Sequence, residues 1–259
     1  MSDAAAHVLS VMTFNVHMWH AIDYSAPNTV RVRRLLERWS PDIVVLNEVT
    51  ATPDPRVVLP PTHGHLAFSP FTGCDNLIAT RLTPLERWAE VIDENRSFVG
   101  LGFETCCVFG THLDVRHEHV RCRQLETLHQ RMTSLAGDRP YLLIGDYNAL
   151  RGDDYDDTDW QGIAESRACS GYEMPLHAAI DVMLARGYID AARRTPHGLQ
   201  PWQERQTKMW SRFATCWAGT RIDYVWMSPG WRWPTRSYRV IDEYCSDHFP
   251  VLVEFELER

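Results

Sequence analysis

The chain has 259 residues, 44% of them hydrophobic, so it is long enough to bury a sizeable core and fits one large domain over residues 1–259. Its net charge of −8 offers no overall positive surface for tight, sequence-independent DNA binding, which disfavours a pure nucleic-acid-binding module. The charge does not exclude a nuclease, because bound divalent cations offset acidic charge where a phosphate must sit.

The N-terminal residues and the cysteines bear on the cellular compartment. Residues 1–7 lack both a basic start and an apolar stretch of signal length, and no later run approaches a membrane span. The seven cysteines are an odd number without metal-ligand spacing, so we interpret them as reduced thiols. We therefore expect a cytoplasmic monomer without membrane contact.

The hydrophobic pattern predicts many strands and few helices. Up to residue 112 it predicts, in order, a strand at 7–15, a helix capped by Asn28 and closed by Pro41, and strands at 42–48, 67–80, 85–91 and 99–112, with turns at Gly73 and Pro84. Beyond it we expect a helix at 117–135 ended by Gly137, a strand at 141–146, a short helix with Pro175 in its first turn, and strands at 221–227 and 249–257. The polar, tryptophan-bearing segment 151–221 is expected to form loops around a site. This pattern favours two packed sheets flanked by helices.

Polar residues stand at the ends of these predicted strands. The apolar run 142–145 leads into Asp146, and the run 43–46 leads through Asn47 into Glu48. A buried carboxylate needs a partner, and a cation supplies one. Each such residue has a structural explanation of its own, but six strands that each end in a costly polar group favour a shared site. The set comprises Asn15, Glu48, His112 with Asp114, Asp146 with Asn148, Asp223, and Asp247 with His248.

Taken together, these motifs resemble the endonuclease/exonuclease/phosphatase superfamily, which has the fold of deoxyribonuclease I. The resemblance spans nearly the whole chain and rests on segments that occur in the family's order, namely 13–15, 47–49, 111–113, 145–148, 221–224 and 246–248. It implies a four-layer α/β sandwich of two mixed, mainly antiparallel sheets flanked by helices.

The resemblance also implies a metal site. Glu48 would be the main ligand of Mg²⁺, with Mn²⁺ as an alternative, and Asn15 and Asp247 would lie in the metal shell, since a hard cation prefers such oxygen donors. One departure concerns the residue before the glutamate, which is usually Gln in this family and is Asn47 here.

The same resemblance assigns catalytic roles to five residues. It implies that Asp146 orients or deprotonates the attacking water and that Asn148 and His112 hold phosphoryl oxygens. It also implies that Asp223 pairs with His248, which stabilises the charge that develops at phosphorus. The motifs assign no carboxylate that orients His112.

Several other polar segments have simpler explanations. Asp114 is either an outer partner of the site or a turn residue. The segment His117-Glu118-His119 is interpreted as a solvated helix turn, and the aspartates at 153–159 as a solvated loop, with repulsion of polyanions or a second cation as alternatives. Five tryptophans either stack on a base or pack in the fold, namely Trp202, Trp210, Trp217, Trp231 and Trp233.

The function implied by the resemblance is divalent-metal-dependent hydrolysis of phosphodiester bonds. We expect nucleic acid or a nucleic-acid adduct as the substrate, short or single-stranded because of the acidic charge. The alternative is a small phosphorylated metabolite or lipid headgroup, although Phe249 replaces a lysine usual in inositol phosphatases. A catalytically inactive binding protein is the third hypothesis, which the retention of Glu48, Asp146 and His248 disfavours.

Overall fold

A computed structural model describes residues 7–69, 75–195, 210–211 and 213–257, and within these ranges the strands pair into two six-stranded sheets. The first sheet has the order β11-β12-β1-β2-β4-β3. Its strands are β1 (His7–Asn15), β2 (Ile43–Val49), β3 (His65–Phe68), β4 (Asp75–Thr80), β11 (Thr235–Val240) and β12 (Val251–Leu257).

The second sheet has the order β5-β6-β7-β8-β10-β9. Its strands are β5 (Glu86–Val91), β6 (Ser97–Gly102), β7 (Cys107–His112), β8 (Tyr141–Asp146), β9 (Ile189–Asp190) and β10 (Asp223–Met227). In each sheet one neighbouring pair, β1 with β2 and β7 with β8, is parallel, while the other pairs are antiparallel. The sheets are therefore mixed and mainly antiparallel, as predicted.

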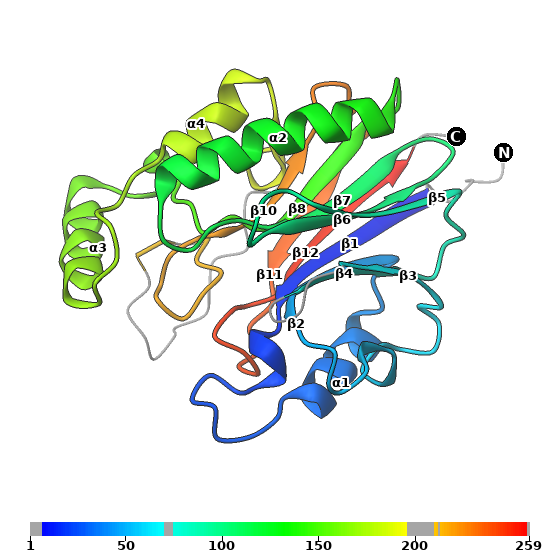
Figure 1. The fold of residues 1–259 in the computed structure, drawn as a ribbon, viewed down its shortest axis with the longest axis horizontal. Coiled ribbons are helices and arrows are strands. Elements are labelled where there is room, and N and C mark those ends of the chain that lie inside the picture. Colours follow the sequence, from blue (N-terminus) through cyan, green and yellow to red (C-terminus); the bar gives the residue numbers. More distant parts are fainter. Residues whose placement is uncertain (1–6, 70–74, 196–209, 212, 258–259) are drawn as a thin grey trace, which may run out of the picture.

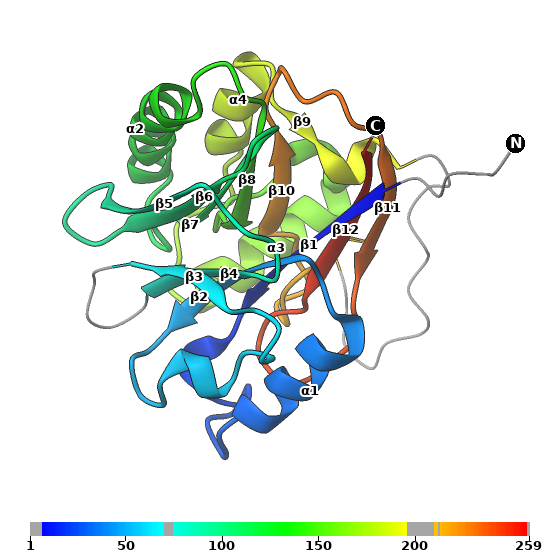
Figure 2. The same ribbon diagram turned by 90° about the vertical axis from the view of Figure 1, so that its right-hand side faces the viewer.

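Helices cover the outer faces of both sheets, which gives four layers (Figures 1 and 2). The described helices are α1 (Thr29–Trp39), α2 (Glu118–Ala136), α3 (Asp157–Cys169) and α4 (Ala178–Ala185). Helix α1 packs on the first sheet, and α2 and α4 pack on the second. None of the described helices is both long and apolar enough for a membrane span.

The strands alternate their side chains between two apolar layers. Val11 and Val45 face the core between the sheets, whereas Met12 and Val44 face α1. Both sets are buried, and burial of each such side chain contributes about 1.5–3 kcal/mol. Burial on both faces explains why the sequence shows continuous apolar runs rather than a strict alternation.

Strand register brings the predicted site residues to one end of the sandwich. In the second sheet Asp146 pairs with His112 on one side and with Asp223 on the other. In the first sheet Asn15 pairs with Asn47. Residues far apart in the sequence therefore meet at the end of the sandwich where β1 stops, away from the chain termini (Figure 1).

Gly145 allows β8 to approach β7 at this end. Its φ is +140°, and a Cβ atom there would lie 1.9 Å from the carbonyl oxygen of Thr111. No other residue type fits this position without displacing the backbone, so the glycine before Asp146 is a requirement of the fold.

Some predicted element boundaries are wrong. The segment 99–112, predicted as one strand, belongs to the hairpin of β6 and β7, in which Phe103 N donates to Cys106 O. The segment 67–80, for which the sequence predicts a turn at Gly73, is divided between β3 and β4, and Gly73 itself lies outside the described residues.

The loop prediction for 151–221 is also partly wrong, because the segment contains α3 and β9 besides the predicted short helix, which is α4, and the edge strand β11 was not predicted. The short helix expected around Pro175 begins later, at Ala178. Asn28 stands at the N-terminus of α1, but its side chain donates to Val16 O and Cys245 O and does not cap the helix. Gly137 ends α2 as predicted.

Candidate active site

The Oδ2 atom of Asp146 lies at the centre of the candidate site. It accepts from Asn15 Nδ2 at 3.1 Å and lies 3.6 Å from both His112 Nε2 and His248 Nε2. Its other oxygen accepts from the backbone N–H of Asn148 at 2.9 Å. The structure thus brings together residues that the sequence placed at the ends of separate strands.

Glu48 is joined to this centre by Asn15, whose Nδ2 also donates to Glu48 Oε1 at 3.0 Å. The register of β2 shifts between Leu46 and Val49, which marks a bulge, and Glu48 has a left-handed φ of 55°. Such a conformation costs on the order of 1–3 kcal/mol in a residue with a side chain. The bulge re-aims the carboxylate from the sheet toward the site.

His248 and Asp223 form a buried pair. His248 Nδ1 lies 2.9 Å from Asp223 Oδ2. Burial opposes the charged imidazole, but the carboxylates of Asp223 and Asp146 outweigh it, so the pKa of His248 is raised well above its usual value. Thr215 Oγ1 accepts from Asp223 N, and Cys216 forms a bridge with His248, so one loop holds both members of the pair.

Asn148 connects the ends of β7 and β8. Its Nδ2 lies 3.0 Å from His112 Nε2 and 3.2 Å from Leu113 O. Because a carbonyl oxygen only accepts, the amide nitrogen must face Leu113, and Nε2 of His112 is then an acceptor. Burial, together with the charges of Arg96 and His248, holds the pKa of His112 well below its usual value, so this imidazole is neutral.

Asp114 has the turn role that the sequence left open. Its Oδ1 accepts from the backbone N–H groups of Arg116 and His117. Among the described residues, His112 Nδ1 has no hydrogen-bond partner. Asp114 therefore does not orient His112.

The carboxyl group of Asp146 is suited to proton transfer. Burial raises its pKa to about 7; the charge of His248 opposes this shift and that of Asp223 adds to it. A group with a pKa near neutrality exchanges protons most readily at physiological pH.

Asp247 lies at the edge of the site. Its side chain is 36% exposed, and its Oδ2 is 3.8 Å from His17 Nε2. Ser246 Oγ donates to Asn15 O at 2.8 Å and lies 3.2 Å from Asp247 Oδ1. Ser246 thereby ties the loop that carries Asp247 to the end of β1.

The donor set near Glu48 fits a hard cation. Glu48 and Asp247 offer carboxylates that are not neutralised by lysine or arginine among the described residues. Oxygen donors of this kind suit Mg²⁺ or Mn²⁺. The amide oxygen of Asn15 accepts from His17 N at 3.0 Å, so Asn15 meets Glu48 with its N–H group.

A second group of metal-ligand type consists of Asp146, Asp223 and His248, whose ligand atoms lie within 4.8 Å of one another. The hydrogen bond between Asp223 and His248 Nδ1 already uses one ligand atom from each of two members. This arrangement suits proton transfer and charge stabilisation better than metal binding.

Two buried asparagines, Asn47 and Asn76, connect the strands that carry the site residues. Asn47 Oδ1 accepts from Asp146 N at 3.1 Å, and its Nδ2 donates to Thr111 O and to Asn76 Oδ1. Asn47 therefore links the two sheets under the catalytic residues, and its presence in the Asn-Glu-Val motif was the sequence signal. Nothing in the sequence indicated Asn76, because its role depends on how the two sheets are stacked.

Arg221 forms a fully buried ionic network next to Asp223. Its Nε donates to Asp154 Oδ2 at 2.6 Å and its Nη2 to Asp190 Oδ2 at 2.8 Å. The guanidinium carbon also lies 4.4 Å from the centroid of the Tyr224 ring. The network fixes the start of β10, and it shows that Asp154 is buried rather than solvated.

The remaining acidic candidates also have structural roles. Glu118 of the His-Glu-His segment is buried, so the prediction of a solvated turn is wrong for this residue. Its carboxylate accepts from Arg121 and from Ala179 N, which joins α2 to α4. Asp156 caps α3 by accepting from Asp159 N at 2.8 Å.

Of the tryptophans predicted either to stack on a base or to pack in the fold, some pack in the interior and one is exposed. Trp231 and Trp233 are buried in the core between the sheets, and Trp210 packs against the cluster under α3. Trp217 is 40% exposed. Trp202 lies outside the described residues.

A sequence model of the Endonuclease/Exonuclease/phosphatase family matches residues 12–248, and the chain belongs to this family. Its fold is similar to that of an endonuclease/exonuclease/phosphatase family protein from Bacteroides thetaiotaomicron, with a TM-score of 0.71 at 17% identity over 98% of this chain and 100% of that one.

Two further structures with this fold are of proteins that are named for different activities. One is a mannosyl-6-phosphatase from Bacteroides thetaiotaomicron, with a TM-score of 0.71 and 16% identity over 96% of this chain and 100% of that chain. The other is an AP endonuclease from Archaeoglobus fulgidus, with a TM-score of 0.66 and 18% identity over 96% of this chain and 100% of that chain. The comparison with curated proteins gives no match. At these identities the structures show the fold and leave the substrate open.

Proposed function

We propose that this chain is a divalent-metal-dependent phosphoesterase that hydrolyses phosphodiester bonds in short or single-stranded nucleic acid or in a nucleic-acid adduct. The observation that carries the proposal is the convergence of Asn15, His112 and His248 on one oxygen of buried Asp146, with Glu48 bound to the same asparagine.

Glu48 and Asp247 are the residues that we propose to hold Mg²⁺ or Mn²⁺, with Asn15 orienting Glu48 through the 3.0 Å hydrogen bond. When bound, such a cation neutralises charge on the phosphoryl group and eases departure of the leaving oxygen. The all-oxygen donor set supports this assignment.

Asp146 is the proposed base. Its Oδ2 takes the proton of the attacking water as the new bond from water oxygen to phosphorus forms and the bond from phosphorus to the leaving oxygen breaks. Burial with Asp223 nearby raises the pKa of this carboxyl to about 7, which matches the task. Asn148 holds Asp146 in place through its backbone N–H, donated to Oδ1 at 2.9 Å.

His248 is the proposed electrostatic stabiliser. Asp223 holds the Nδ1–H group at 2.9 Å, so the Nε2–H group of the charged ring faces the space next to Asp146. A fixed cation there stabilises the negative charge that develops on the phosphoryl oxygens. We propose that His112 and Asn148 contact the same oxygens from the β7 side, which requires the Asn148 amide to leave His112 Nε2, so that the amide N–H group points to the phosphoryl oxygen and Nε2 carries a proton.

Arg96 adds positive charge at this end of the sheet. Its Nε is buried without a hydrogen-bond partner among the described residues, and its charge lowers the pKa of nearby His112. A guanidinium N–H group without a partner is well suited to donate to a substrate phosphate.

A small phosphorylated metabolite is the second candidate substrate. The net charge of −8 favours it, because a chain with a net negative charge repels a long polyanion more strongly than a small phosphoester. The fold shared with the mannosyl-6-phosphatase is compatible with it.

A comparison of substrates tests the proposal. The values of kcat/KM are measured in Mg²⁺ on a short single-stranded oligonucleotide, a 5′-tyrosyl oligonucleotide, an inositol polyphosphate and a simple monoester, with Asp146→Asn as the matched control. We expect one of the first two to be preferred and the variant to be inactive on all four. A preference for either of the last two would overturn the nucleic-acid assignment, and equal rates for variant and wild type would overturn the site.

A further inference from the structure

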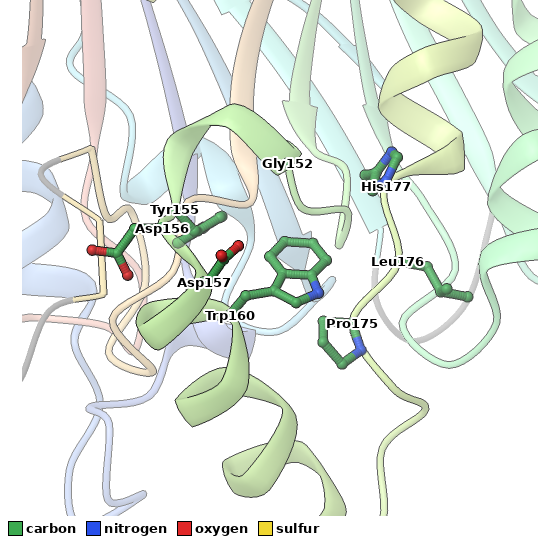
Figure 3. Close-up of a pocket in the computed structure, with 8 residues that line it drawn as sticks. All are labelled: Gly152, Tyr155, Asp156, Asp157, Trp160, Pro175, Leu176 and His177. Carbon is green, nitrogen blue, oxygen red and sulfur yellow. The ribbon is translucent and has the colours of Figure 1, made fainter.

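A cavity of about 410 Å³ lies between the N-terminal turn of α3 and the segment that leads into α4 (Figure 3). Its lining combines aromatic, apolar and acidic residues and contains no lysine or arginine: Gly152, Tyr155, Asp156, Asp157, Trp160, Pro175, Leu176 and His177. We call this cavity the α3 pocket. Its volume falls in the range of small-molecule sites, about 300–1,000 Å³.

The α3 pocket is built on the same supports as the candidate active site. The Tyr155 hydroxyl accepts from Arg221 N at 2.9 Å, shortly before Asp223 in the chain. Under α3, Ile163 packs with Cys216, which bridges to His248. Figure 1 shows α3 on the side of the molecule away from the termini.

The aromatic side chains of the pocket offer ring faces for stacking. The Trp160 ring centroid lies 5.8 Å from that of Tyr155 and 6.2 Å from that of His177. His177 Nδ1 is 2.7 Å from Asp181 Oδ2, which fixes the imidazole and leaves its Nε2 atom for a ligand. Every nucleobase has a flat face that stacks on such rings.

The carboxylates of Asp156 and Asp157 determine which polar groups of a ligand the α3 pocket favours. Asp156 is used as the helix cap and points away from Trp160, whereas Asp157, in the same turn, lies on the side of the indole (Figure 3). Within the part of the chain that the structure describes, Asp157 has no hydrogen-bond partner or ion pair. An acceptor without neighbouring cations repels phosphate but accepts from an amino group such as N4–H₂ of cytosine.

We propose that the α3 pocket binds a nucleobase with an exocyclic amino group, stacked on Trp160 and hydrogen-bonded to Asp157, next to the phosphate that is cleaved. The inference rests on the proposed function, because it names the part of the substrate that this site recognises. Cytosine and uracil differ at the recognised position, so they form a matched pair of ligands.

Hydrolysis and binding test the pocket separately. The kcat/KM ratio of an oligodeoxycytidine to an oligodeoxyuridine of equal length is measured for the wild type, Asp157→Asn and Asp159→Asn. Asp159 is the matched control, because it lies in the same helical turn and is not part of the pocket lining. We expect the wild type and the control to prefer cytosine at least about fivefold, and Asp157→Asn to reduce the ratio below about twofold.

Trp160→Ala is expected to lower kcat/KM for both oligonucleotides by about tenfold through loss of stacking. Trp160→Phe retains an aromatic ring that packs under α3, so its kcat/KM should lie between those of Trp160→Ala and the wild type. If the wild type and Asp157→Asn both hydrolyse the oligonucleotides with the same cytosine-to-uracil ratio of kcat/KM, the proposed base recognition is overturned. The proposed function is unaffected by that result.

Binding of free cytidine and uridine, followed by calorimetry, provides a readout without hydrolysis. Preferential binding of cytidine that Asp157→Asn removes would support the pocket even if no oligonucleotide were cleaved. Equal binding of both nucleosides, or no binding of either, would overturn the proposed base recognition. Tighter binding of choline, a quaternary ammonium ion, than of cytidine would also overturn it, because the pocket would then be a cation site.

Discussion

Replacement of Asp223 by asparagine tests the proposed pair with His248. The two side chains are buried and joined by a 2.9 Å hydrogen bond. A hydrogen bond to a charged group contributes about 1.5–3 kcal/mol, and the variant also removes the charge that supports the protonated ring. If this stabilisation acts in the transition state, kcat falls by about 10- to 150-fold.

The assay is steady-state hydrolysis of the best substrate at saturating Mg²⁺ by Asp223→Asn, His248→Ala and the double variant. Because Asp223 acts through His248, the double variant should be no slower than His248→Ala alone. Asp159→Asn is the control for a lost surface charge, and unchanged far-UV circular dichroism shows that each variant is folded. A kcat of Asp223→Asn within threefold of wild type, or fully additive effects, would refute the reasoning.

Three further changes test other parts of the account. Glu48→Gln should abolish activity in Mg²⁺ and leave the thermal midpoint nearly unchanged; activity within a few fold of wild type would exclude Glu48 as the main ligand. Gly145→Ala should destabilise the fold by about 1–3 kcal/mol or more in urea unfolding, because the added Cβ meets Thr111 O at 1.9 Å; an unchanged midpoint would contradict the close approach of β7 and β8. Arg221→Met removes the fully buried cation between Asp154 and Asp190, which retain only Arg193 and Arg151, and it should cost about 1.5–3 kcal/mol for each lost hydrogen bond, whereas exposed Arg232→Met should cost little; equal effects would contradict the network.

The sequence predicted two packed sheets flanked by helices, and it predicted which polar residues stand at strand ends, because both depend on local patterns. Apolar runs that end in Glu48 and Asp146 mark buried strands and the point where they leave the sheet. Parallel pairing of β7 with β8 then places His112 beside Asp146 without further information. The order of the motifs along the chain, which resembles that of the family, indicated the remaining candidate site residues.

The features that were missed depend on contacts between distant segments. Helix α3 has charged and small residues over much of its surface and buries little beyond Ile163, so its apolar periodicity was too weak to predict a helix. The inter-sheet role of Asn76 and the burial of Arg221 follow from tertiary stacking, which no local pattern encodes. The tight turn between β6 and β7 lacks Pro and Gly after Gly102, which explains why one strand was predicted there.

Metal-dependent cleavage by Asp146 is the central claim, and one reconstitution experiment tests it directly. The purified chain is stripped with EDTA, incubated with a short single-stranded oligonucleotide, and then supplied with Mg²⁺, Mn²⁺ or Zn²⁺ beside the Asp146→Asn variant. We expect no cleavage in EDTA, recovery with Mg²⁺ or Mn²⁺, poor recovery with Zn²⁺, and no cleavage by the variant in any metal. Full activity in EDTA, or cleavage by Asp146→Asn at the wild-type rate, would contradict it.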